Sequence, residues 1–266
     1  MPTITLLTDF GIDDEYVGLM KGVILSINPS AAIVDITHQI DPQDLIQAAF
    51  TIKSSYCYFP KNTVHLIVVD PGVGGKRDII AVQMMGHIFI APDNGVLTLI
   101  YDEGNIDAIV RIENSTYFLK SVSQTFHGRD IIAPVGAHIA NGVELNRVGA
   151  ELGLRDIVRL PDLRSSISQK GELIGKIVSI DRFGNLITNI ESKQVNDYCQ
   201  RDQSCKPQIW IGQNIVVGIT TTYESAAQNQ PLALIGSRGF LEVAVNKGCA
   251  KQHFNVKKGD RVKVII

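Results

Sequence analysis

Three polar segments in the first half of the 266-residue chain carry side chains suited to chemistry. Asp9 lies in the segment TDFG, directly after an apolar run, and its carboxylate could accept two hydrogen bonds from a ribose diol. Asp70 opens the glycine-rich segment DPGVGGKR, which ends at Arg77. His127 lies in the turn TFHGRD, where an imidazole could move a proton near neutral pH. Helix capping stays open as an alternative role for Asp14, and a structural ion pair for Asp70 with Arg77.

The glycine-rich segment does not predict a phosphate-binding loop. The spacing G-x-x-x-x-G-K-[ST] is not met, and the segment leads into a predicted strand rather than a helix. The chain also contains no H-x-x-x-H or C-x-x-C pattern, so we expect no metal site.

Two turns in the second half of the chain carry side chains that could bind a small molecule. Asp181 and Asn185 lie in DRFGN, and an Asn amide can pair with the edge of an adenine ring. Ser237 and Arg238 lie in SRGF, and a guanidinium fork matches the two oxygens of a carboxylate. Ordinary turn chemistry remains the alternative for each.

The elements that position the first set alternate between strands and helices, which favours an α/β fold with a mostly parallel sheet and helices on both faces. Ligands bind outside the carboxyl ends of the strands in such sheets, which is where Asp9 and Asp70 are expected. Strands are predicted at 3–8, 32–36, 64–69 and 108–112, a hairpin at 79–82 and 87–90, and helices at 13–27, 41–56, 95–101 and 129–140.

The pattern changes after residue 155, where a polar stretch with Pro161 precedes a series of short β-rich runs. No helix is expected after Gly171, and the runs predict a small all-β barrel or sandwich. We therefore expect an N-terminal α/β domain at 1–158, a linker at 159–170 and a C-terminal β-barrel domain at 171–266. The predicted strands are 173–180, 186–190, 208–211, 214–220, 232–235, 241–245 and 261–266.

Composition limits the classes of function. The formal net charge is −2, which argues against nonspecific binding to nucleic acid. No apolar run reaches 18 residues, and the N-terminus lacks the basic region of a signal peptide and turns acidic by Asp9, so we expect a cytoplasmic protein without membrane spans. Four cysteines are too few for a disulfide scaffold. Cys199 and Cys205 could pair, although two free thiols are the favoured interpretation.

Six motifs in order resemble one known family over essentially the whole chain: TDFG, VVDPGVGG, APDNG, TFHGRD, FGNLITN and SRGFLEVAVN. The chain resembles the S-adenosyl-L-methionine (SAM) hydroxide adenosyltransferases, which are SAM hydrolases that form adenosine and are related to SAM-dependent fluorinases and chlorinases. The resemblance implies an N-terminal α/β domain joined to a C-terminal β-barrel. It also implies a homotrimer, with each active site between the N-terminal domain of one subunit and the C-terminal domain of the next.

The implied reaction converts SAM and water to adenosine and L-methionine by in-line attack on C5′. The resemblance assigns water activation to Asp70, Arg77 and His127. Arg77 would lower the pKa of the water, Asp70 would orient it, and His127 would take or relay its proton. SAM would be the substrate, and no cofactor is implied.

The same resemblance implies a set of substrate-binding residues. Asp9 would hold the ribose hydroxyls, with Asp14 near the ribose or the methionine end. In the second half, the resemblance implies that Asn185 contacts the adenine, that Tyr223 stacks on it and that Asn246 supports the adenine pocket. Asp181 and Ser237 would contact the methionine ammonium, and Arg238 its carboxylate. Asn94 of APDNG, in the first half, completes the set.

The residues favour hydrolysis over halogenation. A halide pocket needs hydrogen-bond donors and no carboxylate, whereas Asp70 would repel an anion. The fluorinases that this chain resembles carry an aromatic residue where Asp70 stands, a Tyr where His127 stands, and a Ser where Gly128 stands. The alternatives are a SAM- or adenosine-binding protein without turnover and, more remotely, a SAM-dependent halogenase.

Overall fold

The computed structural model describes residues 1–161, 163–200 and 206–266, and the chain divides into two compact units, Met1–Pro161 and Asp162–Ile266. The division falls inside the stretch 159–170 that the sequence assigns to a linker. Part of that stretch is β8 (Ser166–Ile167), which pairs with β9 and so belongs to the sheet of the second unit.

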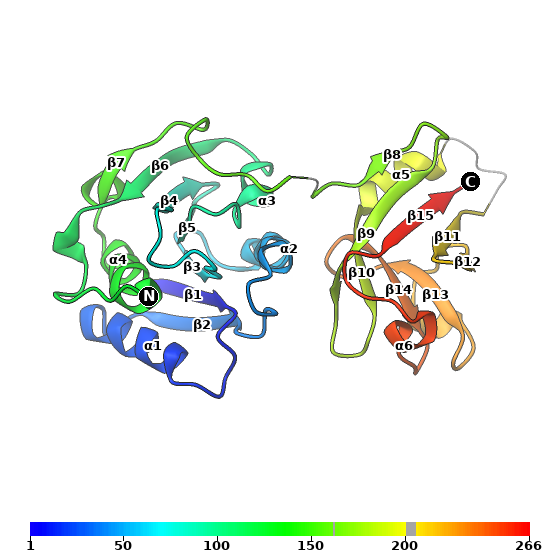
Figure 1. The fold of residues 1–266 in the computed structure, drawn as a ribbon, viewed down its shortest axis with the longest axis horizontal. Coiled ribbons are helices and arrows are strands. Elements are labelled where there is room, and N and C mark those ends of the chain that lie inside the picture. The colour runs from blue at the N-terminus through cyan, green and yellow to red at the C-terminus, as the bar shows by residue number, and fades with distance from the viewer. Residues whose placement is uncertain (162, 201–205) are drawn as a thin grey trace. The chain divides into compact units, whose positions relative to one another are not determined.

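The first unit is built on a seven-stranded sheet with the order β2-β1-β3-β5-β4-β6-β7 (Figure 1). The pairings β1–β2, β1–β3 and β3–β5 are parallel, whereas β4–β5, β4–β6 and β6–β7 are antiparallel. The sheet is therefore mixed, and β4 and β7 run against the other five strands. The strands are β1 (Thr3–Thr8), β2 (Ala32–Thr37), β3 (Val64–Val68), β4 (Ile79–Met84), β5 (His87–Pro92), β6 (Ile106–Ile112) and β7 (Gly149–Glu151).

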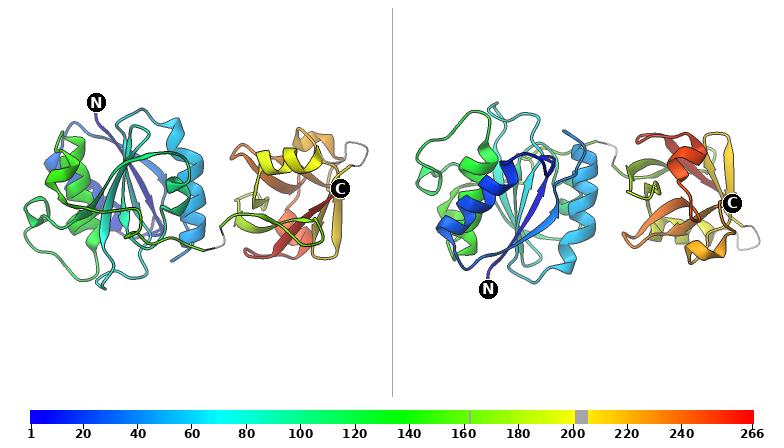
Figure 2. Two further views of the ribbon diagram at one scale, coloured as in Figure 1. Left: turned by 90° about the horizontal axis from the view of Figure 1, so that it is seen from above. Right: turned by 90° about the horizontal axis from the view of Figure 1, so that it is seen from below.

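Helices cover both faces of this sheet, as the two views in Figure 2 show. On one face, α1 (Tyr16–Ile27) and α4 (Ala133–Ala140) bury apolar side chains in a shared core with β1 and β3. On the other face, α2 (Leu45–Ser55) and α3 (Thr98–Tyr101) pack in a second core. The buried strands are apolar on both sides for this reason.

Helix boundaries in the first unit differ from the expected ones for local reasons. The helix α1 begins at Tyr16, so the acidic residues before it lie outside its first turn. The helix α2 begins after Asp44, whose Oδ1 accepts a hydrogen bond of 2.8 Å from Gln47 N. The helix expected at 129–140 is two elements: a π-helical turn at Gly128–Ile132 followed by α4.

The second unit is an antiparallel sheet curled into a nearly closed barrel, with the order β12-β11-β15-β9-β10-β14-β13. An isolated bridge between Thr220 and Leu234 joins its two ends. The apolar side chains inside form a core that is separate from the cores of the first unit. The strands are β9 (Leu173–Ile180), β10 (Leu186–Glu191), β11 (Gln208–Ile211), β12 (Asn214–Val217), β13 (Pro231–Ile235), β14 (Phe240–Val245) and β15 (Arg261–Ile265).

The expectation that no helix follows Gly171 is wrong. The helix α5 (Ser192–Cys199) starts with a capping box formed by Glu191 and Gln194, and it buries Val195 and Tyr198 against the barrel. The helix α6 (Ala250–Phe254) ends at a left-handed residue, Asn255. Both are short, and α5 is mostly polar, so their apolar periodicity is too weak to be recognised in the sequence.

Two further expectations concern cysteines and membrane spans. Cys205, the possible partner of Cys199, lies outside the described residues, and the described cysteines Cys57, Cys199 and Cys249 are free thiols. Among the described residues, no helix has the length and apolar character needed to cross a bilayer.

Candidate active site

Two predicted side chains at the carboxyl ends of neighbouring parallel strands and a third from the turn before the π-helical segment line one cavity. The strands β1 and β3 pair with Thr8 opposite Val68, so the residues that follow them leave the sheet at the same edge. Asp9, Asp70 and His127 all line a cavity of about 380 Å³ there. This is the edge at which open α/β sheets bind ligands.

Arg77 lies behind this cavity and joins two of its lining residues. Its Nε donates to Asp70 Oδ1 and Oδ2, each at 3.0 Å, and its Nη2 donates to Asp70 Oδ2 at 2.5 Å. The same Nη2 donates to His127 Nδ1 at 2.9 Å. The side chains of Arg77 and Asp70 are only 12% and 6% exposed, so this ion pair is largely removed from water. The three residues thus form one hydrogen-bonded set.

The hydrogen bond from Arg77 fixes the tautomer of His127. A guanidinium has only N–H donors, so Nδ1 of the imidazole must accept with its lone pair. The proton of the neutral ring is therefore on Nε2. Burial lowers the pKa of His127, and the positive charge of Arg77 lowers it further. The carboxylates of Asp70 and Asp130 and the Ser123 carbonyl act in the opposite direction, but the net pKa lies below the usual 6.5, so the ring is mostly neutral at pH 7. His127 consequently has a hydrogen-bond donor, rather than a free lone pair, on its second nitrogen.

Glycine allows the two loops of this set to approach each other. Gly74, with φ +74°, lies so close to the next loop that a Cβ there would come within 2.2 Å of the Gln124 carbonyl oxygen. Gly128 likewise lies against Val68, at the end of β3, where a Cβ would be 3.1 Å from the valine side chain. The glycines therefore place Arg77 within reach of His127.

An aromatic cluster, which the sequence analysis did not single out, lines the same cavity. The rings of Phe10, Tyr16 and Phe126 pack with centroid distances of 5.2–5.7 Å. Phe10 and Phe126 lie inside two of the quoted motifs, directly beside Asp9 and His127, which is the signal that could have identified them. The cluster gives the cavity an apolar side.

The structure places the other predicted residues of the first unit differently. Asp9 accepts a hydrogen bond of 2.8 Å from Gln43 N and still lines the cavity. Asn94 donates to the Val69 carbonyl at 2.9 Å and so holds the end of β3 directly before Asp70, outside the lining of the cavity. Asp14 is exposed and is also outside that lining.

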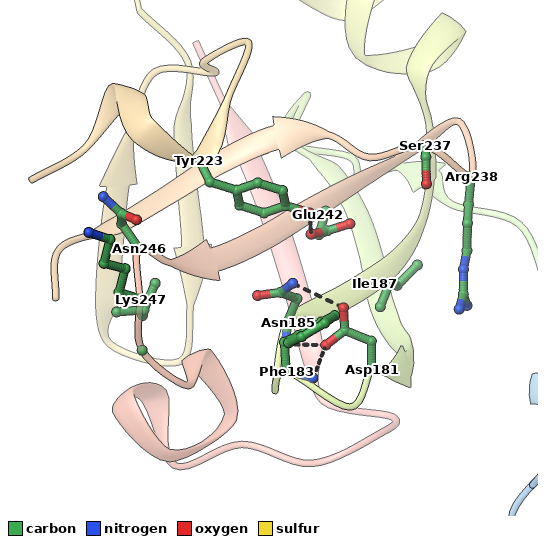
Figure 3. Close-up of a pocket in the computed structure, with 12 residues that line it drawn as sticks. Asp181, Phe183, Asn185, Ile187, Tyr223, Ser237, Arg238, Glu242, Asn246 and Lys247 are labelled. Carbon is green, nitrogen blue, oxygen red and sulfur yellow. Dashed lines mark hydrogen bonds between the residues drawn. The ribbon is translucent and has the colours of Figure 1, made fainter. Parts of the chain in front are cut away.

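A second cavity, of about 570 Å³, lies in the second unit (Figure 3). It brings together all six residues predicted there: Asp181, Asn185, Tyr223, Ser237, Arg238 and Asn246. They come from the turn between β9 and β10, the turn between β13 and β14, the end of β14, and a 3₁₀ turn, η5 (Tyr223–Ser225).

Two of these side chains, Asp181 and Asn185, form hydrogen bonds within their own turn. Asp181 Oδ1 accepts from the backbone N–H groups of Phe183 and Asn185 at 2.9 Å, and its Oδ2 accepts from Asn185 Nδ2 at 3.0 Å. Arg238 is exposed and makes no hydrogen bond or ion pair with any residue that the structure describes. The guanidinium of Arg238 is therefore available to an anionic group.

Glu242 is a lining residue of the second cavity that sequence reasoning missed. It is the single charged residue of β14 and is only 7% exposed. Burial raises the pKa of its carboxyl group, against the lowering effect of a hydrogen bond from Tyr223. Its one signal in the sequence is a charge inside an otherwise apolar strand.

Comparison with known proteins gives a family for both units. Residues 4–149 match the N-terminal domain of the SAM hydroxide adenosyltransferases, and residues 175–263 match the C-terminal domain of the same family. The chain belongs to the SAM hydroxide adenosyltransferase family. The two matched regions contain the residues of the first and second cavities, respectively.

Relatives of this SAM hydroxide adenosyltransferase family member match it over nearly its full length. A Thermus thermophilus protein named (R)-S-adenosyl-L-methionine hydrolase is 33% identical, covering 100% of both chains. A fluorinase from an Actinoplanes species is 30% identical, covering 99% of this chain and 97% of its own. A crystal structure of an uncharacterised conserved protein from Thermotoga maritima is 37% identical with a TM-score of 0.92, covering 99% of this chain and 100% of that one.

Proposed function

We propose that this protein hydrolyses SAM to adenosine and L-methionine. The observation that carries the proposal is the hydrogen-bonded set of Asp70, Arg77 and His127 at a cavity of a chain that belongs to the SAM hydroxide adenosyltransferase family. In the reaction, a C5′–O bond forms from water and the C5′–S bond breaks. Its electron pair stays on sulfur, which leaves as a neutral thioether, and one proton is released.

The hydrogen bonds among Asp70, Arg77 and His127 support a different role for each residue. Asp70 accepts the proton of the water, because a carboxylate keeps acceptor sites besides those that Arg77 occupies. His127 lines the cavity beside Asp70 and holds the guanidinium of Arg77 through its Nδ1. Arg77 holds both groups and does not line the cavity. We therefore assign the proton to Asp70 rather than to His127.

The second cavity supports the assignment of substrate-binding residues. Arg238 would bind the α-carboxylate of the methionine part, and Ser237 beside it would contact the ammonium group with Asp181. Asn185 and Tyr223 would bind the adenine, with Asn246 as support. In the first cavity, Asp9 would hold the ribose hydroxyls. Asp14 and Asn94 would act from outside the lining, with Asn94 holding the backbone before Asp70.

Three further proposals concern the oligomeric state of the enzyme, its need for a cofactor and its cellular location. We propose a homotrimer in which one substrate meets the first cavity of one chain and the second cavity of a neighbouring chain, as the family resemblance implies. The proposal agrees with the division of the required groups between the two cavities. We also propose that no cofactor takes part, because the sulfonium provides its own leaving group. A cytoplasmic location agrees with the free thiols of the described cysteines.

The configuration of the substrate at sulfur is part of the proposal. The Thermus thermophilus relative is named for the R form of the sulfonium. We propose that this protein also prefers that form.

The test is to incubate the purified protein with each sulfonium epimer of SAM, with and without chloride or fluoride, in heavy-oxygen water. Adenosine and methionine in equal amounts, independent of halide and with heavy oxygen in the 5′-hydroxyl, are the expected products. A 5′-halogenated nucleoside would instead make the protein a halogenase. Retention of SAM without any product would leave a binding protein, and faster cleavage of the S form would contradict the proposed preference.

A further inference from the structure

Glu242 and Tyr223 form a short hydrogen bond inside the second cavity. The Tyr223 hydroxyl donates to Glu242 Oε1 at 2.6 Å, and both residues line the cavity (Figure 3). A buried carboxylate needs such a partner, because removal from water disfavours its charge. Its second oxygen, Oε2, accepts no hydrogen bond from the described residues.

The backbone around Tyr223 gives its ring little support. Tyr223 begins the three-residue turn η5 in the connection between β12 and β13, and the residue is 44% exposed. Residues 221–225 of this connection are all exposed. The bond to Glu242 is the only hydrogen bond of the Tyr223 side chain within the described part of the chain.

A second tether of the same connection also comes from the end of β14. Asn246, the residue after this strand, donates from Nδ2 to the Ala226 carbonyl at 2.7 Å. Glu242 therefore holds the first residue of η5, and Asn246 holds the residue directly after it. The strand β14 itself is buried at every residue, so it is a firm base for both tethers.

The other carboxylate of the cavity could not replace Glu242. Both oxygens of Asp181 accept hydrogen bonds within their own turn. Loss of the Glu242 carboxylate would thus leave the Tyr223 hydroxyl without an acceptor from the described residues at its present place.

We propose that Glu242 is a positioning residue for the nucleoside part of the substrate, which acts by fixing the Tyr223 ring as a wall of the cavity. This inference rests on the proposed function, because it takes the occupant of the cavity to be an adenine nucleoside. A ring fixed before binding loses less conformational freedom when the flat base packs against it, so the tether strengthens binding. Glu242 itself need not touch the reacting atoms.

The test compares Tyr223→Phe, Glu242→Gln and Glu242→Leu with the parent protein by calorimetric titration with adenosine and by SAM kinetics. Tyr223→Phe and Glu242→Leu should each weaken adenosine binding by about 5-fold, the usual worth of one hydrogen bond. The double variant should be no weaker than Glu242→Leu, since both changes remove the same bond. Glu242→Gln should bind within about 2-fold of the parent, because its amide oxygen still accepts. In Tyr223→Phe and Glu242→Leu, the KM for SAM should rise while kcat changes little.

Tyr198→Phe is the matched control. The Tyr198 hydroxyl donates to the Gly171 carbonyl at 2.8 Å, in the same unit but outside the cavity. This variant should lose some thermal stability and keep its adenosine affinity. If Glu242→Leu does not fold, the comparison of Tyr223→Phe with Tyr198→Phe decides alone.

Three outcomes would overturn the inference. Unchanged adenosine affinity in Tyr223→Phe and Glu242→Leu, with normal SAM turnover, would refute the positioning role and leave the proposed function standing. Equal weakening by Tyr198→Phe would reduce the effect to general stability. A parent protein that turns over no SAM and binds no adenosine would refute both proposals.

Discussion

At the scale of single residues, the guanidinium of Arg77 orients the Asp70 carboxylate and sets the tautomer of His127. Because it donates to both, Asp70 is held as an oriented acceptor and His127 as a neutral ring with its proton on Nε2. A lysine could not do this, since a single ammonium lacks the planar fork. The assignment of roles within the set depends on this one side chain.

The first prediction concerns Asp70. Asp70→Asn keeps the size of the side chain but removes the base, so turnover of SAM should fall by about 10²–10⁴-fold while binding is retained. Single-turnover kinetics and ligand titration measure the two effects. Asp78→Asn is the matched control, because Asp78 forms an exposed ion pair with Arg111 and does not line the cavity. Parental rates in Asp70→Asn would show that this carboxylate is not the base.

The second prediction concerns the titration of His127. Burial and the charge of Arg77 both lower its pKa below the usual 6.5, so the ring should stay neutral at pH 6.5 and protonate only at lower pH. In Arg77→Gln the neighbouring charge is gone, and the pKa should rise. NMR titration of the imidazole, assigned with His127→Gln, measures both values. A wild-type pKa above 6.5 would contradict the hydrogen-bonding scheme.

At the scale of elements, loops rather than helices or strands bring the reacting groups together. Asp70 and Arg77 flank a loop between β3 and β4, and His127 precedes a π-helical turn. Such turns within helices occur often at functional sites. The strand β3 fixes where the first loop leaves the sheet, and Gly74 fixes how near it comes to the second.

The third prediction tests this approach of the two loops. In Gly74→Ala, the new methyl group would clash with the Gln124 carbonyl and the residue would be strained at φ +74°, so the loops must separate. Turnover should fall by about 10²-fold, as expected for a small misplacement of reacting groups. Gly142→Ala is the control, because Gly142 has φ +99° with no atom close to a Cβ. A loss of turnover of the same size in Gly142→Ala would show that backbone strain, rather than separation of the two loops, lowers the activity.

At the scale of the whole molecule, the required groups are divided between two units. The first unit carries Asp70, Arg77 and His127, and the second carries Asn185 and Arg238. Neither unit has both a water-activating set and the predicted groups for the base and the amino acid. In the proposed trimer, assembly and activity therefore depend on each other.

The fourth prediction tests shared sites between subunits. Asp70→Ala and Arg238→Ala should each be nearly inactive, Asp70→Ala through chemistry and Arg238→Ala through SAM binding. If an equal mixture is unfolded and refolded together, random trimers should regain activity at about a quarter of their sites. A failure to regain any activity, with both proteins refolded and trimeric by light scattering, would place each site within one subunit.

The sequence by itself predicted most of the strands and helices, and nine of its twelve candidate site residues line one of the two cavities. The apolar strands of both units and the hairpin of β4 and β5 follow from local patterns, and polar residues such as Asp9 and Asp70 stand out because they end buried strands. The polar helix α5 was missed because its helical signal depends on a capping box and two buried residues.

Only the tertiary structure decided the contacts between distant residues. The Arg77–His127 bond spans 50 positions, and the Tyr223–Glu242 bond joins an exposed turn to a buried strand. The tautomer of His127, the outward place of Asp14 and the backbone role of Asn94 depend on such contacts. The spacing of residues in a chain gives the types of groups available, whereas their hydrogen bonds and pKa values depend on which groups folding brings within a few ångströms.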